Sequence, residues 1–316
     1  MSDTLAQIGE HPLIERLVAG LPSGAQIVLG AGDDAAVLRF SGDVVISTDT
    51  MVEDVHFKRA WSTPHDVGRK AAASSIADIE AMGARPVALV VALSVAQSES
   101  VDWIQGLRDG IVAECGRAGA QLVGGDISSG PVPVITCTVL GDMGTLRPVT
   151  RSGAKPGQVI AYAGRLGMAH AGWMVLRRGF RSPAAVVDAH RVPQPPYGQG
   201  AVAALAGATS MIDISDGLVA DLGHVAKASS VELRVDTGKL PIHEAQATVG
   251  QALGGADPVE FLLVGGDDHA LVATFDPAAV PDGWRVIGEV RAGEPGVLVD
   301  GEPWSEAGGW DHFTAR

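Results

Sequence analysis

Residues Val44–Asp49 read Val-Val-Ile-Ser-Thr-Asp, a β-branched apolar run followed by two hydroxyls and a carboxylate. Such a run predicts a strand that ends at the polar residues. Aspartates in similar settings, beside glycine or a strand-like run, recur at Gly32-Asp33-Asp34, Gly125-Asp126, Asp213–Asp216 and Gly266-Asp267-Asp268. Carboxylates that converge in one place repel one another unless a cation lies among them, and hard oxygen ligands suit Mg²⁺. The sequence therefore predicts that scattered acids meet around Mg²⁺.

Strand and helix patterns alternate along the chain. Strands are expected at 35–38, 44–47, 87–95, 121–123, 132–140, 158–162, 211–214, 232–235, 270–275, 284–290 and 296–299. Helices are expected at 63–83, 100–118, 168–178, 199–206 and 218–228. Thr63 and Asp66 are spaced as a capping box around Pro64, and Ser215-Asp216 is typical of a helix N-cap. These patterns predict an α+β fold.

The stretch from Gly141 to Gly157 is rich in glycine and proline, which is typical of a domain boundary. We therefore expect an N-terminal domain over residues 1–145 and a C-terminal domain over 146–316. The sequence Leu-Val-Gly-Gly-Asp occurs at 122–126 and again at 263–267, a weak indication of internal duplication.

Composition narrows the function classes. Hydrophobic residues make up 46% and charged residues 19% of the 316 residues, which indicates a globular protein. The net charge of −14 argues against binding nucleic acid. The longest apolar run, Pro86–Ala96, is too short to span a bilayer, and no signal peptide is visible. Cys115 and Cys137 lie in apolar stretches and are expected to be reduced and buried. Together these features predict a cytoplasmic protein without a membrane partner.

Each acid has a structural and a functional reading. Ser47, Thr48 and Asp49 could satisfy backbone donors in a turn or offer three oxygens to a cation. Asp78 falls on an apolar helical stripe, so it needs either a cation or a partner such as Arg69 or Arg85.

The second half of the chain offers a similar set. Alternation places Asp213 and Ser215 on one side of a strand, and Asp216 opens a helix whose N-terminus favours anions or a phosphate-bound metal. The Gly124–Asp126 stretch lets backbone approach a ligand, and Arg151 could clamp a phosphate.

Familiar catalytic signatures are missing from the sequence. It contains no nucleophile elbow, zinc-protease helix, Walker loop or protein-kinase motif. His56 reads by itself as a loop histidine.

Taken together, the motifs resemble the thiamine-monophosphate kinase family within the aminoimidazole-ribonucleotide-synthetase-like ATP-binding superfamily. The matching segments run in order and nearly end to end: 32–37, 47–50, 56–57, 78–84, 122–126, 150–157, 213–217, 265–268 and 310–313.

The resemblance implies a two-domain fold of that superfamily and a homodimer that forms through the N-terminal domain. It implies that ATP phosphorylates thiamine phosphate to thiamine diphosphate by direct in-line transfer, with Mg²⁺ ions assisting and no covalent nucleophile. The metal ligands implied by motif position are Asp33, Ser47, Thr48, Asp49, Asp78, Asp126, Asp213 and Asp216. The implied ATP contacts are Gly125, Asp126, Arg151 and Ser215, with Arg151 also stabilising transition-state charge. The implied thiamine phosphate contacts are His56, Asp267 and Trp310.

The chain departs from the family pattern at one motif. The family usually reads Gly-Gly-Glu-Asp-Tyr where residues 265–269 read Gly-Gly-Asp-Asp-His, so Asp267 is one methylene shorter. Alternatives remain open at this stage. They are another superfamily enzyme such as selenophosphate synthetase or aminoimidazole-ribonucleotide synthetase, a non-catalytic nucleotide-binding regulator, and a kinase for a related hydroxymethyl-pyrimidine or sugar phosphate.

Overall fold

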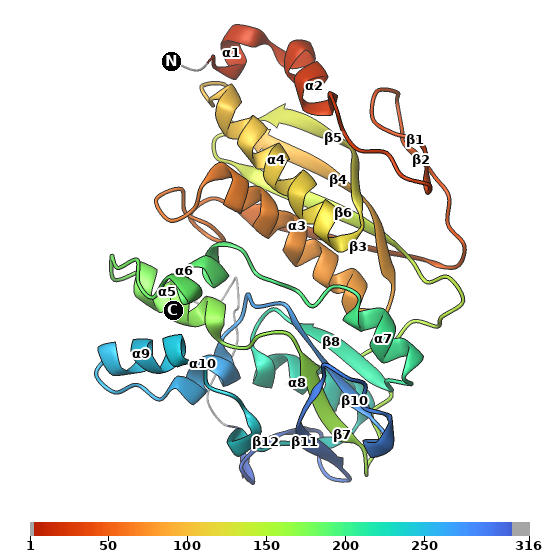
Figure 1. The fold of residues 1–316 in the computed structure, drawn as a ribbon, viewed down its shortest axis with the longest axis vertical. Helices are drawn as coiled ribbons and strands as arrows, with labels where there is room; N and C mark the ends of the chain where they lie inside the picture. Colours follow the sequence, from red (N-terminus) through yellow and green to blue (C-terminus); the bar gives the residue numbers. More distant parts are fainter. Residues whose placement is uncertain (1–2, 305–316) are drawn as a thin grey trace. The chain divides into compact units, whose positions relative to one another are not determined.

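The computed structural model describes residues 3–304 and divides them into two compact units (Figure 1). The first unit comprises Met1–Ile79 with Ala84–Thr145, and the second comprises Glu80–Gly83 with Leu146–Arg316. Each unit contains its own sheet and helices, so the mixed α+β character expected from the sequence holds in both. No helix within residues 3–304 is long and apolar enough to cross a membrane.

A four-stranded sheet with strand order β3-β6-β4-β5 forms the centre of the first unit. Helices α3 and α4 lie on one face of this sheet (Figure 1). The elements of this unit are α1 (Leu5–Ile8), α2 (Glu10–Val18), β1 (Ile27–Leu29), β2 (Val37–Leu38), β3 (Val44–Val52), α3 (Pro64–Ala81), β4 (Arg85–Val95), α4 (Val101–Ala118), β5 (Gln121–Ser129) and β6 (Val134–Asp142).

Local signals explain both long helices. The Thr63 backbone N–H donates to Asp66 Oδ2, and the Asp66 N–H donates to Thr63 Oγ1, so the predicted capping box of α3 is confirmed. Ser100 Oγ accepts from Trp103 N at the start of α4. The two helices pack very closely, because a Cβ on Gly110 would come within 2.1 Å of the His65 carbonyl oxygen. Glycine therefore sets the spacing of this helix pair.

A seven-stranded sheet of order β13-β12-β9-β11-β7-β10-β8 forms the second unit, antiparallel except where β12 pairs with β9. Its apolar cluster includes Phe275, Met211 and Trp284. Its strands are β7 (Val159–Ala163), β8 (Ser210–Ile214), β9 (Glu232–Val235), β10 (Ala270–Phe275), β11 (Arg285–Arg291), β12 (Gly296–Val299) and β13 (Glu302–Pro303). Its helices are α5 (Met168–Leu176), α6 (Ala184–Arg191), α7 (Gln199–Leu205), α8 (Leu218–Ser229), α9 (Glu244–Ala252) and α10 (Pro258–Val264), with short 3-10 turns at Thr237–Lys239 and Pro277–Ala279.

Several sequence expectations need correction. Strand β3 does not end at Ser47-Thr48-Asp49 but continues to Val52, because the whole segment pairs with β6. Strand β5 likewise runs through Gly124–Asp126 to Ser129. The N-cap of α8 is Gly217 and not Ser215 or Asp216.

The idea of an internal duplication is wrong for the repeated pentapeptide. Residues 122–126 lie in strand β5, whereas 263–264 end helix α10 and 265–267 form a turn. Helices α1, α2, α6, α9 and α10 and strands β1 and β13 were not expected. They are short or only weakly periodic elements.

Candidate active site

Strand β3 and helix α3 bring two of the expected metal ligands together. Ser47 Oγ donates to Asp78 Oδ2 at 2.5 Å, although 31 positions separate these residues in the sequence. Residues two apart on a strand share a face, so Asp49 lies on the same side of β3 as Ser47. Asp49 is half-buried and pairs in register with Cys137 on β6. The helix-covered side of β3 therefore carries the Ser47 hydroxyl, which contacts Asp78, and the Asp49 carboxylate.

The two arginines suggested as partners for Asp78 contact other carboxylates. Arg69 Nε lies 2.7 Å from Glu114 Oε2, and Arg85 lies 3.7 Å from Asp142 Oδ2. The hydrogen bond from Ser47 gives Asp78 a polar partner, so its role as a cation ligand stays a prediction.

The Thr48 side chain lies on the other face of β3. Its Oγ1 is 3.0 Å from Thr138 Oγ1 and 3.2 Å from the Cys137 carbonyl oxygen. Thr48 would therefore reach the side of Ser47 and Asp49 only through its main chain.

Strand β5 presents Gly125 and Asp126 at the opposite edge of the same sheet. A Cβ on Gly125 would lie 2.3 Å from the Val91 carbonyl oxygen, so only glycine fits. Asp49 and Asp126 sit on the two edge strands, three strand spacings or about 14 Å apart. One chain therefore cannot place both carboxylates on a single ion.

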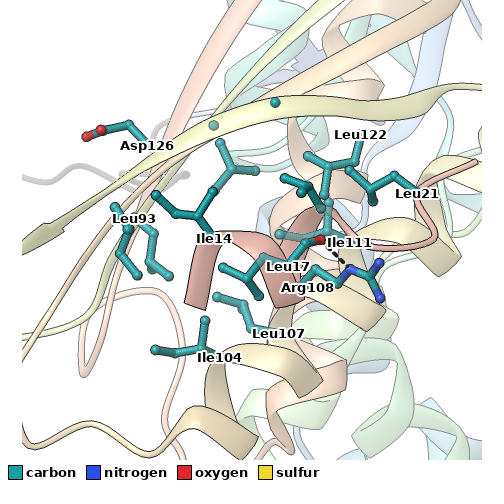
Figure 2. A pocket seen from close by; sticks show the side chains of 15 residues that line it. Ile14, Leu17, Leu21, Leu93, Ile104, Leu107, Arg108, Ile111, Leu122 and Asp126 are labelled. Carbon is teal, nitrogen blue, oxygen red and sulfur yellow. Dashed lines mark hydrogen bonds between the residues drawn. The ribbon is translucent and has the colours of Figure 1, made fainter. Parts of the chain in front are cut away.

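An apolar cavity of about 100 Å³ opens between α2, α4 and the β4–β5 strands and reaches Gly124–Asp126 (Figure 2). Its walls are aliphatic: Ile14, Leu17, Val18, Leu21, Val91, Leu93, Ile104, Leu107, Ile111, Leu122 and Ile127. Arg108 lies at its border, where Nε donates to the Leu17 carbonyl and one Nη donates to the Ala19 carbonyl. The Asp126 carboxylate points away from the aliphatic side chains (Figure 2). The cavity thus combines an apolar interior with a polar edge.

Two further expected residues lie in loops of the first unit. Asp33 is exposed between β1 and β2, where its Oδ1 accepts from Asp34 N at 2.8 Å. His56 Nδ1 accepts from Val52 N at 3.0 Å, so a neutral ring carries its proton on Nε2, which is a donor suited to phosphate.

The loop that carries His56 is held by Arg59. This guanidinium pairs with Glu53 and, through two bonds, with Glu99, and it stacks 4.3 Å from the Trp103 ring centroid.

In the second unit the acids gather at the end of β8. Asp213 is buried, and Ser215 and Asp216 follow directly. Asp221, on the first turns of α8, accepts from the backbone N–H groups of Asp216 and Gly217 at 3.1 Å each. Burial, reinforced by the carboxylates of Asp213 and Asp216, raises the pKa of Asp221 to about 8 despite these hydrogen bonds. The excess of negative charge here is the condition that a bound cation would relieve.

The turn over residues 266–269 is fastened to this strand end. Asp267 N donates to the Ser215 carbonyl at 2.8 Å, and His269 N donates to the Ile214 carbonyl at 2.9 Å. His269 Nδ1 lies 3.0 Å from Asp213 Oδ2. Asp268 Oδ1 accepts from Ala169 N at 2.9 Å, and burial raises the pKa of Asp268 to about 7. Asp267 and Asp213 are therefore parts of one local arrangement.

The Arg151 segment is anchored to the same unit. Met211 N donates to the Thr150 carbonyl, and Ser229 Oγ donates to the Arg151 carbonyl, both at 3.1 Å. The Arg151 side chain is exposed, so its guanidinium is accessible to an anion. Trp310 lies outside the described residues.

Within residues 3–304, no three His, Cys, Asp or Glu side chains are grouped closely enough to hold an ion by themselves. Both cysteines are free and buried, and burial raises the pKa of Cys115 to about 12, which leaves it a poor nucleophile.

Comparisons with known proteins cover both units of the chain. The AIR synthase related protein N-terminal domain matches residues 32–143, and the corresponding C-terminal domain matches residues 155–301. Thiamine-monophosphate kinase of Mycobacterium tuberculosis (strain ATCC 25618 / H37Rv) is 47% identical over 313 residues, covering 99% of this chain and 94% of that protein. The chain belongs to the thiamine-monophosphate kinase family.

Solved structures of family members have the same fold. AaThiL complexed with AMPPCP and TMP superposes with a TM-score of 0.81 at 30% identity, covering 96% of this chain and 95% of that one. Thiamine-monophosphate kinase from Stenotrophomonas maltophilia K279a gives a TM-score of 0.81 at 32% identity, covering 94% and 98%. The two-domain fold of the AIR synthase related proteins is thereby established for this chain.

Sequence reasoning missed three residues at this family's candidate site. Asp221 holds the loop that carries Asp216, and His269 contacts Asp213. His190 Nδ1 lies 3.9 Å from Asp267 Oδ2. An acid in the first turns of a helix is a signal that could have identified Asp221. Nothing in the sequence pairs either histidine with its carboxylate.

Proposed function

We propose that this chain transfers the γ-phosphoryl group of ATP to thiamine phosphate, forming thiamine diphosphate and ADP. The similarity over nearly the whole chain to AaThiL complexed with AMPPCP and TMP carries this proposal. The arrangement of acids supports it, because phosphoryl transfer needs positioning and charge neutralisation and no covalent nucleophile.

The donor set suits Mg²⁺. The expected ligands offer carboxylate and hydroxyl oxygens. Burial, together with the carboxylates of Asp213 and Asp216, raises the pKa of Asp221, and a cation would relieve this unfavourable environment. Mg²⁺ is usually held by one or two carboxylates together with waters and substrate phosphates, so a three-residue cage is not required.

The proposed metal ligands fall into two sets. Asp33, Ser47, Thr48, Asp49, Asp78 and Asp126 belong to the first unit, and Asp213 and Asp216 belong to the second. When bound, the metal neutralises charge on the phosphates.

Protein side chains would stabilise the negative charge that remains on the phosphate oxygens. Arg151 would pair with phosphate oxygens as negative charge spreads over them, and Ser215 would donate its hydroxyl to the nucleotide. His56 would donate through Nε2 to the phosphate of thiamine phosphate. Asp267 and Trp310 would complete the contacts with that substrate.

We propose that the adenine base binds in the apolar cavity beside Gly124–Asp126. Aliphatic walls suit the faces of a purine, and Gly125 leaves the backbone open to the nucleotide. Leu17→Trp, which fills the cavity, should raise the KM for ATP about tenfold, the cost of roughly 1.4 kcal/mol of lost binding. Steady-state kinetics should show an unchanged KM for thiamine phosphate. Leu205→Trp, at a site 73% exposed, is the control. An unchanged KM for ATP in Leu17→Trp would place the base elsewhere.

We further propose a homodimer formed through the uncovered face of the four-stranded sheet. Val44 and Ile46 on that face are 48% and 65% exposed, unusual values for large apolar residues on a strand. A second copy whose β5 edge meets the β3 edge of the first could also bring its Asp126 close to Asp49, which one chain cannot do. We expect the dimer to be cytoplasmic and to bind neither membrane nor nucleic acid.

A coupled assay of ADP formation tests the activity. Thiamine phosphate with Mg-ATP should give ADP and thiamine diphosphate, whereas hydroxymethyl-pyrimidine phosphate and sugar phosphates should not. Binding of Mg-ATP without any acceptor-dependent ADP would instead identify a regulator.

A further inference from the structure

One imidazole in the second unit lies between two carboxylates with different proposed tasks. His269 Nδ1 is 3.0 Å from Asp213 Oδ2, and His269 Nε2 is 3.8 Å from Asp267 Oδ1. The side chains of His269 and Asp213 are only 8% and 7% exposed. Asp213 is a proposed metal ligand, and Asp267 is a proposed contact of thiamine phosphate.

The backbone fixes where this ring can lie. Asp267 and His269 both have positive φ, at 69° and 53°, a conformation that is unfavourable for residues other than glycine. Their N–H groups are bonded to the carbonyls of Ser215 and Ile214 at the end of β8. The ring therefore extends from a turn that is fastened to the strand of Asp213.

The contact with His269 supplies a hydrogen-bond donor to the buried carboxylate of Asp213. A buried carboxylate requires donors, and the Nδ1–H of His269 donates to Oδ2 of Asp213. That bond fixes the rotation of the carboxylate. The Nε2 side of the ring lies 3.8 Å from Asp267 Oδ1, which is a packing contact and not a hydrogen bond, so the ring limits how closely the second carboxylate approaches the first.

We propose that His269 is a positioning residue that bridges Asp213 and Asp267, so that a single ring sets the metal ligand and the substrate contact relative to each other. This inference rests on the proposed phosphoryl transfer for its functional meaning. Groups that orient a metal ligand typically contribute 10- to 100-fold in metal affinity. The bridge therefore predicts two separable effects, one on Mg²⁺ and one on thiamine phosphate.

Two amide substitutions separate the effects. In His269→Asn the side-chain amide occupies the place of Nδ1 and keeps a donor to Asp213, but the part of the ring beside Asp267 is lost. In His269→Gln the amide occupies the place of Nε2, so the donor to Asp213 is lost and a side chain beside Asp267 remains. His269→Phe keeps the ring beside Asp267 and removes the donor to Asp213. His224→Asn, at an exposed position on α8, is the matched control.

Metal affinity is read from the thermal stabilisation by Mg²⁺ at fixed AMPPCP, and substrate affinity from the KM for thiamine phosphate. His269→Asn should keep the wild-type Mg²⁺ midpoint and raise the KM several-fold. His269→Gln should shift the Mg²⁺ midpoint 10- to 100-fold and change the KM little. His269→Phe should shift the Mg²⁺ midpoint as His269→Gln does, because both variants lose the donor to Asp213.

Equal losses in all three variants, or wild-type behaviour of His269→Phe, would overturn the bridge. Failure of the proposed function looks different, because wild-type protein would then form no ADP with thiamine phosphate. The Mg²⁺ stabilisation series does not depend on turnover.

Discussion

Substitution of Asp49 should reduce activity without changing the stability of the fold. Its half-buried carboxylate lies in the middle of β3, where the backbone bonds to β6 do not depend on the side chain. Asp49→Asn keeps the shape and removes the charge, so metal-dependent ADP formation should fall on the order of 100-fold or more. Circular dichroism and Tm should remain close to wild type. Asp43→Asn, one residue before the same strand and exposed, serves as the control. Normal turnover in Asp49→Asn would remove Asp49 from the site.

At the scale of elements, Asp142 joins strand β6 to the segment between β2 and β3. Its carboxylate accepts from Ser41 N, Ser41 Oγ, Gly42 N and Gly144 N at 2.8–3.0 Å. Asp142→Asn would turn an amide N–H₂ toward some of these donors. The free energy of unfolding at pH 7 should fall by about 2–4 kcal/mol, measured by urea denaturation.

The difference in free energy of unfolding between wild type and Asp142→Asn should depend on pH in a defined direction. Burial alone would raise the pKa of Asp142, but the hydrogen bonds from Gly144, Ser41 and Gly42 outweigh it and lower the pKa to about 2. A lowered folded pKa stabilises the fold above the ordinary value near 4, and the stabilisation is lost as the pH falls toward 2. The gap between wild type and Asp142→Asn should therefore be constant from pH 7 to 5 and narrow below pH 4. A gap that persists at pH 2.5 would contradict this account.

At the scale of the whole molecule, the uncovered face of β3 predicts the oligomeric state. Ile46→Glu places a charge in the proposed interface and should convert a dimer to a monomer in sedimentation, with a large loss of activity. Phe180→Glu is matched to it, because Phe180 is also 65% exposed but lies in the second unit. A folded Ile46→Glu protein that remains dimeric would exclude this face.

Mixing variants tests whether two chains build one site. Asp49→Asn and Asp126→Asn should each be inactive, but dimers that contain one of each would have one site with both carboxylates intact. An equal, fully exchanged mixture should recover about a quarter of wild-type ADP formation, since half of the dimers are mixed and each has one working site. No recovery after exchange, followed by gel filtration of tagged chains, would assign both carboxylates to the same chain's site.

Sequence patterns predicted the elements that local chemistry determines. The start of α3 followed from Thr63 and Asp66, and strands β9, β10 and β12 followed from short apolar runs between turn residues. The extents of β3 and β5 could not be predicted, because hydroxyls, glycines and acids in their middles are poor strand formers that pairing with β6 and β4 holds in place.

The candidate site was also predicted only in part. The sequence indicated which acids are candidate ligands, but not which side chains contact them. The contact of Ser47 with Asp78 and that of His269 with Asp213 join positions 31 and 56 apart, a separation that only the folded chain reveals.

The left-handed turn that holds Asp267 and His269 has a consequence for laboratory evolution. Glycine at position 267 would relieve backbone strain of roughly 1 kcal/mol, so a library selected only for heat resistance should enrich glycine there. Glycine at position 269 would not be enriched, because it would leave the buried carboxylate of Asp213 without its donor. Variants with glycine at position 267 should gain thermal stability and lose activity, so a selection for both properties requires that residue 267 be left unchanged.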